Sequence, residues 1–256
     1  MSSLLRMQHS SLQYSDPKKQ QQADIRDLFR QGSNFPIKTG TEAGLSRNGG
    51  NMNRRYLQMN SERYNHEIAF NGDVWVAVDK KIIVPRSVRK AKVPLAKGVK
   101  RVGMGHDPCL ASMTFDHVDR KIGTVSVACT HYPTKGRLPR DPNHDVNKAA
   151  AQDINDWFEK NSSGDKLAFL NGDFNMNDAK QDWSFGEDFL SLGDELKEYP
   201  NSGHGPIDGF MSYNKDKRVS GKAIYSLDDR QMFQFSDHWV VRGVWEIADL
   251  KEGTKK

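Results

Sequence analysis

The apolar segments of the chain are short and numerous, and this pattern constrains the fold most strongly. Nine segments of four to nine residues have the composition of β-strands: 4–9, 37–42, 74–78, 81–84, 110–115, 122–130, 166–171, 207–213 and 238–246. In one of them Val125, Val127 and Cys129 alternate with polar or small residues, as in a half-buried strand. Residues 167–170 are continuously apolar, as expected of a strand covered on both faces.

Helical patterns are fewer. One begins near Pro17 and ends before Gly32, and a second begins near 143–145 and ends at 161–164. The Asn-, Gly- and Arg-rich stretch 44–56 predicts a long loop. Many strands with few long helices between them predict two sheets packed face to face, with helices outside.

The composition favours a globular chain in a reducing compartment. Its 256 residues are 36% hydrophobic and 28% charged, and no apolar run approaches the roughly 20 residues that span a bilayer. Cys109 and Cys129 are too few for a disulfide scaffold and do not form a metal-type pair. We therefore expect a cytoplasmic protein without a signal peptide or a membrane partner. We expect one domain over 1–246, followed by a charged tail at 247–256.

The net charge of +5 favours a polyanionic partner only mildly, but the distribution is uneven. Residues 79–101 carry nine basic residues and one acid. This segment is either a solvated basic hairpin or a nucleic-acid contact.

Ionisable side chains recur where apolar segments end. The sequence NGDFN at 171–175 follows a buried run, His131 follows another, and Asp237-His238 stands directly before a third. Each of these features alone has an ordinary explanation, since Asp and Asn are common in turns. Asp208 is harder to explain, because a carboxylate in an apolar strand must be paired or neutralised.

The order of these features resembles the endonuclease/exonuclease/phosphatase (DNase I-like) family. The matching motifs are TEA (41–43), TH (130–131), NGDFN (171–175), PIDGF (206–210) and SDHWVV (236–241). The resemblance spans most of the chain, and it is more specific for the family than for a substrate. It implies a four-layer α/β sandwich, with two mixed sheets packed together, helices outside and a site at one end.

The resemblance also implies a divalent-metal site for Mg²⁺ or Mn²⁺. Glu42 would be the principal ligand, and Asp237 would join that shell or hold a second ion. Asp173 would orient and deprotonate the attacking water or would bind the metal. Asn175, two residues further on an extended chain, would lie on the same side as Asp173 and meet the same phosphate.

Two histidines complete the expected catalytic group. His131 and His238 would donate to the phosphate, and one of them would act as general acid or base. Asp208 would orient His238, which would also explain its place in an apolar strand. The family's asparagine after the first strand is missing here, and Gln8, His9 or Ser10 stands in its region. The partner of His131 is not evident from the sequence, and Glu67 is a weak candidate.

These features predict a metal-dependent phosphodiesterase, and most specifically a nuclease. The basic balance favours nucleic acid, DNA over RNA, with backbone contacts from Arg54, Arg55, Lys90 and Lys92. No obligate protein partner is implied. The alternatives are a phosphomonoesterase acting on inositol phosphates or nucleic-acid ends, and a nonenzymatic nucleic-acid-binding protein of the same fold.

Overall fold

Twelve strands and three α-helices make up the part of the chain that the computed structural model describes. The described residues are 2–12, 21–31, 34–43, 50–103, 107–133, 140–163, 166–175, 189–191, 208–213, 218–224 and 240–248. The helices are α1 (Gln21–Gln31), α2 (Gly50–Arg63) and α3 (His144–Asn161). The strands are β1 (Ser3–Ser11), β2 (Ile37–Thr41), β3 (His66–Asn71), β4 (Val74–Asp79), β5 (Arg89–Pro94), β6 (Cys109–Asp116), β7 (Thr124–His131), β8 (Leu167–Asp173), β9 (Phe189–Ser191), β10 (Asp208–Tyr213), β11 (Val219–Ile224) and β12 (Val241–Ile247).

The strands form two six-stranded mixed sheets. The first sheet has the order β11-β12-β1-β2-β4-β3, and its β1 and β2 are parallel. The second has the order β5-β6-β7-β8-β10-β9, and its β7 and β8 are parallel. The other strand pairs in both sheets are antiparallel. Each parallel pair ends at the same edge of its sheet, which matters for the site described below.

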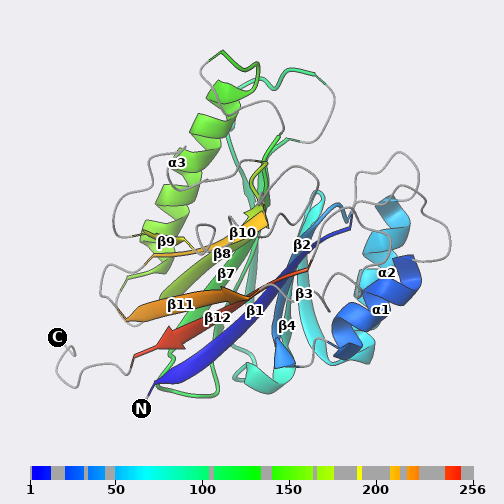
Figure 1. Ribbon diagram of the computed structural model, residues 1–256, viewed down its shortest axis with the longest axis vertical. Helices are drawn as coiled ribbons and strands as arrows, with labels where there is room; N and C mark the ends of the chain where they lie inside the picture. The colour runs from blue at the N-terminus through cyan, green and yellow to red at the C-terminus, as the bar shows by residue number, and fades with distance from the viewer. Residues whose placement is uncertain are drawn as a thin grey trace.

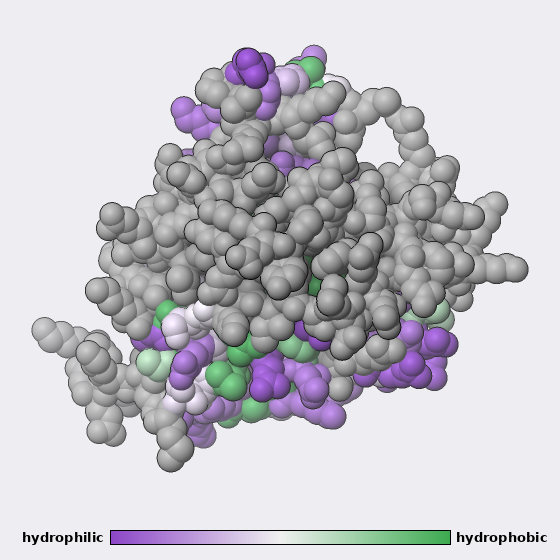
Figure 2. Space-filling view, in the orientation of Figure 1, coloured by the Kyte–Doolittle hydropathy of each residue, from purple (hydrophilic) through white to green (hydrophobic). Residues whose placement is uncertain are grey.

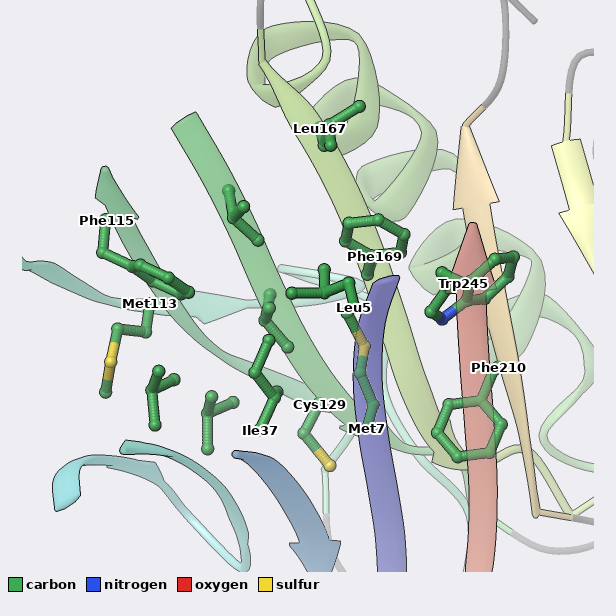
Figure 3. Packing of buried hydrophobic residues seen from close by; sticks show 14 of the residues in the cluster. Leu5, Met7, Ile37, Met113, Phe115, Cys129, Leu167, Phe169, Phe210 and Trp245 are labelled. Atoms are coloured by element: carbon green, nitrogen blue, oxygen red, sulfur yellow. The ribbon is translucent and has the colours of Figure 1, made fainter. Parts of the chain in front are cut away.

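The two sheets pack face to face through one apolar core. Figure 3 shows Leu5, Met7 and Ile37 from the first sheet facing Met113 and Phe169, among others, from the second. The strands β6, β7 and β8 contribute every second residue to this core, because alternate side chains point to opposite faces of a strand. The remaining side chains of these strands face the helices.

The helices cover the outer faces of the sandwich. Apolar residues of α1 and α2 pack against Trp75 and Ala77, which lie on the outer face of the first sheet. Residues of α3, including Ile154 and Phe158, pack against the outer face of the second. In Figure 1 α1 and α2 lie on one side of the sheets and α3 on the other. The predicted four-layer α/β sandwich is therefore confirmed.

Several elements differ from the predictions. The predicted loop at 44–56 is wrong from residue 50 onward, where α2 begins. The segment 81–84 is not a strand, because a 3₁₀ helix, Lys80–Ile82, covers its first two residues and Ile83 forms only an isolated β-bridge with His117. The sequence patterns also missed four strands: β3, β5, β9 and β11. Of these, β5 is exposed and basic, so it lacks the apolar alternation on which strand prediction depends.

The described surface mixes polar and apolar side chains. On the face shown in Figure 2 the apolar residues along the lower edge are interspersed with hydrophilic ones. Large exposed apolar side chains among the described residues are Leu4, Met59, Val84, Val99, Val102 and Val118. Within the described ranges, no helix combines the length and the apolarity needed to cross a bilayer.

Candidate active site

Several strands bring ionisable residues to one end of the sandwich. In the parallel pair β7–β8, His131 lies opposite Asp173, and both residues end their strands. On the neighbouring strands Cys109 lies opposite His131, and the main chain of residue 208 lies opposite Asp173. The sheet register alone therefore gathers the second sheet's contribution to the site.

Glu42 reaches the same place from the first sheet through an irregular backbone. It follows β2 and has a φ of 63°, in the left-handed region that non-glycine residues rarely adopt. Gly40 pairs with Trp75, whereas Ala43 donates its N–H to the Asp73 carbonyl at 2.8 Å, so the strand of Glu42 holds one extra residue. Such a bulge redirects a side chain. The Glu42 carbonyl also accepts a hydrogen bond from Asn53 Nδ2 at 3.4 Å.

Asp73, in the turn between β3 and β4, belongs to the site although it is not among the site residues predicted from the sequence. Its carboxylate is fully buried, and its Oδ2 lies 2.6 Å from His131 Nδ1. Asp73 is therefore the partner of His131, and the candidate Glu67 was wrong. Glu67 pairs instead with Lys90 at 2.7 Å and Lys80 at 3.4 Å, and the hydrogen bond from Lys90 lowers its pKa.

A sequence signal for Asp73 did exist. Residues 71–73 and 171–173 have the same sequence, Asn-Gly-Asp, and both follow an apolar strand. The two aspartates approach the same imidazole from different sheets. The first copy looks like an ordinary hairpin turn, because Asn-Gly between two strands is the usual sequence of such a turn.

Three carboxylates surround His131. Its Nδ1 lies 2.6 Å from Asp73 and 3.9 Å from Glu42 Oε1, while its Nε2 lies 3.5 Å from Asp173 Oδ2. Burial of the imidazole disfavours its charged form, but the hydrogen bond that Nδ1 donates to Asp73 and the charges of the three carboxylates outweigh burial and raise the pKa of His131 to about 9. The surrounding carboxylates therefore favour the charged form of His131.

The donor set suits a hard divalent cation. Glu42, Asp73 and His131 have potential ligand atoms within 4.8 Å of one another. Asp73 already engages Nδ1 of His131, so the member of this group best suited to a cation is the carboxylate of Glu42, because Mg²⁺ prefers oxygen to nitrogen. With Asp173 included, three carboxylates face one imidazole, an excess of negative charge that a divalent cation would offset.

The NGDFN motif places Asp173 as expected but places Asn175 differently. Asn175 lies beyond the end of β8 with a φ of 52°, so the extended geometry assumed for the pair does not hold. Its N–H donates to Asp173 Oδ1 at 2.9 Å, and its Nδ2 donates to the Tyr132 carbonyl at 2.6 Å. The buried ring of Phe174 packs edge-on against Tyr132, with centroids 5.8 Å apart, and anchors the turn.

Two other residues of the motif have structural roles. A side chain at Gly172 would bring its Cβ within 2.5 Å of the Thr130 carbonyl oxygen, so only glycine fits there. Asn171 is fully buried and donates from Nδ2 to Thr39 Oγ1 of the first sheet at 3.0 Å. The same Thr39 hydroxyl lies 3.0 Å from His9 Nδ1. A polar contact between the sheets thus lies beneath the site.

The three candidate positions near the end of β1 supply no amide to the site. Gln8 donates to the Leu28 carbonyl of α1 at 3.3 Å, so it faces the helices. Ser10 lies on the same face of the strand as Gln8, and His9 takes part in the contact between the sheets. Ser11 ends the strand opposite Thr41, next to Glu42, and takes the position nearest the cluster on β1.

The predicted nucleic-acid contacts lie on two elements. Arg54 and Arg55 are exposed on α2, and the guanidinium of Arg54 lies 4.7 Å from the centre of the Phe70 ring. Lys90 and Lys92 lie on the exposed edge strand β5. Lys90 is ion-paired with Glu67, which reduces its capacity to contact a phosphate.

Three of the predicted site residues lie wholly or partly outside the described part of the chain. Asp237 and His238 lie outside the described residues, as does the side chain of Asp208. The chain re-enters the described part at residue 240, and Val241 pairs with His9 at the end of the sheet that holds the site. The roles predicted for these three residues stay predictions.

Comparison with known proteins gives structural matches without sequence matches. No family model matches the chain, and no curated protein matches it in sequence. The human Nocturnin catalytic domain, solved with a bound sulfate anion, superposes with a TM-score of 0.68 at 11% identity, covering 96% of this chain and 97% of that one. An endonuclease/exonuclease/phosphatase family protein from Bacteroides thetaiotaomicron gives 0.67 at 13% identity, covering 98% and 100%.

A third structure contains a nucleic acid. D. rerio TDP2, complexed with a single-strand DNA product, gives a TM-score of 0.62 at 12% identity and covers 95% of this chain and 99% of that one. The matches extend over nearly the whole of each chain, so they concern the complete sandwich rather than one sheet. The chain therefore has the fold of the endonuclease/exonuclease/phosphatase (DNase I-like) proteins.

Proposed function

We propose that the protein is a member of the endonuclease/exonuclease/phosphatase family that hydrolyses phosphodiester bonds in nucleic acid, with DNA preferred to RNA. The observation that carries this proposal is the contact of the His131 ring with the carboxylates of Glu42, Asp73 and Asp173 at the end of a sandwich of this fold. A buried cluster of one imidazole and three carboxylates has no evident structural purpose. Phosphoryl transfer, in contrast, needs hydrogen-bond donors and acceptors of this kind.

Glu42 would hold Mg²⁺ or Mn²⁺, together with Asp237 as the sequence suggests. When bound, such an ion neutralises charge on phosphoryl oxygens. Two properties of the chain support the assignment: the excess of carboxylates in the cluster, and the bulge that turns Glu42 towards His131. The other contributions come from the chain's own side chains.

His131 would donate a hydrogen bond from Nε2 to the phosphate as negative charge develops. Asp73 fixes the ring through Nδ1 and keeps it protonated, which leaves Nε2–H directed towards the side of Asp173. A donor that is already oriented costs no reorganisation when the charge forms. Asp173 would orient and deprotonate the attacking water, with its Oδ1 held by the Asn175 N–H.

The remaining groups are assigned by sequence. His238 would act as a second acid or base, oriented by Asp208, whose main chain lies opposite Asp173. Asn175 would contact a non-bridging oxygen, and for this its amide would have to exchange the Tyr132 carbonyl for the phosphate. That exchange keeps the amide satisfied in both states.

Nucleic acid is favoured as substrate by charge and by one structural relative. The chain carries a net charge of +5, and exposed basic residues lie on α2 and β5. The D. rerio TDP2 structure contains a single-strand DNA product. The alternative is a phosphomonoesterase acting on inositol phosphates or nucleic-acid ends, which would use the same carboxylates and histidines on a more compact substrate.

One panel of substrates tests the proposal. Plasmid DNA, single-stranded DNA, RNA and an inositol polyphosphate would each be incubated with Mg²⁺, Mn²⁺ or EDTA. We expect metal-dependent cleavage of DNA, and a loss of at least roughly 10²-fold in Asp173→Asn and in His238→Ala. Asp156→Asn, a carboxylate on the exposed side of α3, is the matched control and should retain activity.

Two results would contradict the proposal. Full turnover of nucleic acid in excess EDTA would remove the metal role of Glu42. Release of phosphate from the inositol polyphosphate, without cleavage of any nucleic acid, would establish the phosphomonoesterase instead.

A further inference from the structure

The turn that carries Asp73 is attached to the opposite sheet. It connects β3 and β4 of the first sheet, yet Asn71 Nδ2 donates to the carbonyls of Val93, at 3.2 Å, and Leu110, at 3.1 Å, in the second sheet. Val93 and Leu110 lie opposite each other on β5 and β6. One carboxamide thus connects the hairpin of one sheet to two strands of the other.

Cys109 adds a second attachment beside the first. Its thiol donates to the Asn71 carbonyl at 3.2 Å, and its sulfur lies 3.8 Å from Asp73 Oδ1. Between these residues Gly72 has a φ of 58°, and a Cβ there would lie 3.1 Å from the same sulfur. The turn is therefore fitted closely against the edge of the second sheet.

These contacts fix a carboxylate that has little freedom to adjust. Asp73 is fully buried, and its own carbonyl accepts the Ala43 N–H at 2.8 Å. Its carboxylate meets His131, on the second sheet, at 2.6 Å. Because Asp73 and His131 belong to different sheets, the length of this hydrogen bond depends on how the turn is held against the second sheet.

We propose that Asn71 is a positioning residue, whose carboxamide holds the β3–β4 turn on the second sheet so that Asp73 orients His131. The catalytic part of this inference rests on the proposed function, whereas its structural part does not. Asn suits the position because its amide has two N–H groups, one for each carbonyl. Alanine has no donor, and serine keeps one.

Steady-state kinetics and a double-mutant cycle test the catalytic part. We expect Asn71→Ala to lower kcat about ten- to a hundred-fold, the effect of a small misplacement of a reacting group, with little change in KM. Asn71→Ser should recover part of the loss. In an Asp73→Ala background, Asn71→Ala should have almost no further effect, because Asn71 acts through Asp73.

The matched control is Asn161→Ala. Asn161 also donates its amide to a carbonyl, that of Trp157 at 2.7 Å, but lies at the end of α3. We expect Asn161→Ala to lower the free energy of unfolding about as much as Asn71→Ala does, without the loss in kcat. An equal loss of kcat from Asn71→Ala in both the wild-type and the Asp73→Ala backgrounds would overturn the inference, since it would show a general structural effect.

A second measurement does not depend on activity. In protein labelled with ¹⁵N-histidine, the Nδ1 proton of His131 should give a strongly deshielded resonance in the wild type and in Asn161→Ala, because its hydrogen bond is short. The resonance should shift or disappear in Asn71→Ala, or in Asn71→Ser if the alanine variant does not fold. An unchanged resonance in the folded variant would overturn the inference. A changed resonance in a protein that cleaves none of the substrates would contradict only the proposed function.

Discussion

Glu42 has a backbone conformation that its residue type disfavours. Its φ of 63° costs a non-glycine residue roughly 1–2 kcal/mol, and the Asn53 amide and the Ala43–Asp73 hydrogen bond hold it in place. Strain of this kind persists where the neighbouring structure imposes it, which occurs often at functional sites. In this site the bulge directs Glu42 towards the imidazole of His131.

Substitutions at Glu42 should separate strain from chemistry. Both Glu42→Gly and Glu42→Ala remove the carboxylate, so both should lose at least roughly 10²-fold in turnover. Glycine relieves the left-handed strain and alanine does not, so the glycine variant should be the more stable by about 1 kcal/mol. Urea unfolding of the two variants, with hydrolysis measured in parallel, checks both expectations. A more stable alanine variant would show that the strain is absent in solution.

At the scale of elements, β2 and the helix α1 enclose a lysine. Lys38 has no exposed surface, its Nζ donates to the Phe35 carbonyl at 2.6 Å, and the ring of Phe29 on α1 lies 6.0 Å away. Burial lowers the pKa of Lys38 to about 7, against a smaller opposing effect of Asp79. Arg242 on β12, whose guanidinium stacks over Phe35, lowers it further.

This lysine predicts a pH dependence of stability. Between pH 7 and pH 10.5 the unfolded chain holds a proton at Lys38 that the folded chain has released, so the contribution of Lys38 to the free energy of unfolding rises with pH over that range. Lys38→Met should stabilise the protein near pH 7, and its advantage should shrink by about 2 kcal/mol between pH 7.5 and 9.5.

Denaturant unfolding of wild type and Lys38→Met at the two pH values measures this change. Lys81→Met, on an exposed 3₁₀ helix, subtracts the general effect of removing a surface lysine. An advantage for Lys38→Met that stays constant with pH would contradict the lowered pKa.

The elements predicted from the sequence are those in which buried apolar residues recur at a regular spacing along the chain. Strands such as β7 and β8 have one or both faces buried, so apolar periodicity reveals them, and α3 buries Val146, Ile154 and Phe158 at helical spacing. Helix α2 was missed because its sequence, rich in Asn and Arg, buries few residues and owes its place to Leu57 against the first sheet.

The site could be predicted in part for a related reason. Asp173 and His131 end buried strands, which the sequence marks clearly, whereas Asp73 is defined by contacts across the two sheets. Local sequence carries no information on such contacts, and Asn-Gly-Asp between two strands looks like a turn. The left-handed turn of Asn175 likewise depends on Tyr132, which is distant in sequence.

At the scale of the whole molecule, the site lies where the two sheets meet. Glu42 and Asp73 come from the first sheet, and His131 and Asp173 from the second. The sheets are held together by an apolar core and, beneath the site, by the Asn171–Thr39 hydrogen bond. Substrate would therefore approach the end of the sandwich, with α2 on the side of the first sheet and β5 at the edge of the second.

This arrangement predicts how salt affects binding of a nucleic acid. Each phosphate neutralised by a basic side chain releases counterions, so the logarithm of the affinity should fall linearly with the logarithm of salt concentration, by roughly 0.7 to 0.9 per phosphate. Replacing Arg54 and Arg55 with alanine should weaken binding to all sequences and flatten this slope. Replacing Lys90 and Lys92 should have a smaller effect, because Lys90 is already paired with Glu67.

Binding of single- and double-stranded DNA to an inactive Asp173→Asn variant, measured between low and moderate salt, checks this expectation. The matched control replaces Lys121 and Lys160, two exposed lysines at the opposite end of the second sheet, before β7 and at the end of α3, and removes the same charge away from the site. Equal slopes for the α2 pair and this control pair would show that only net charge matters. A flat slope for the parent variant would favour a compact substrate such as an inositol phosphate, since such a ligand cannot reach basic residues on both α2 and β5.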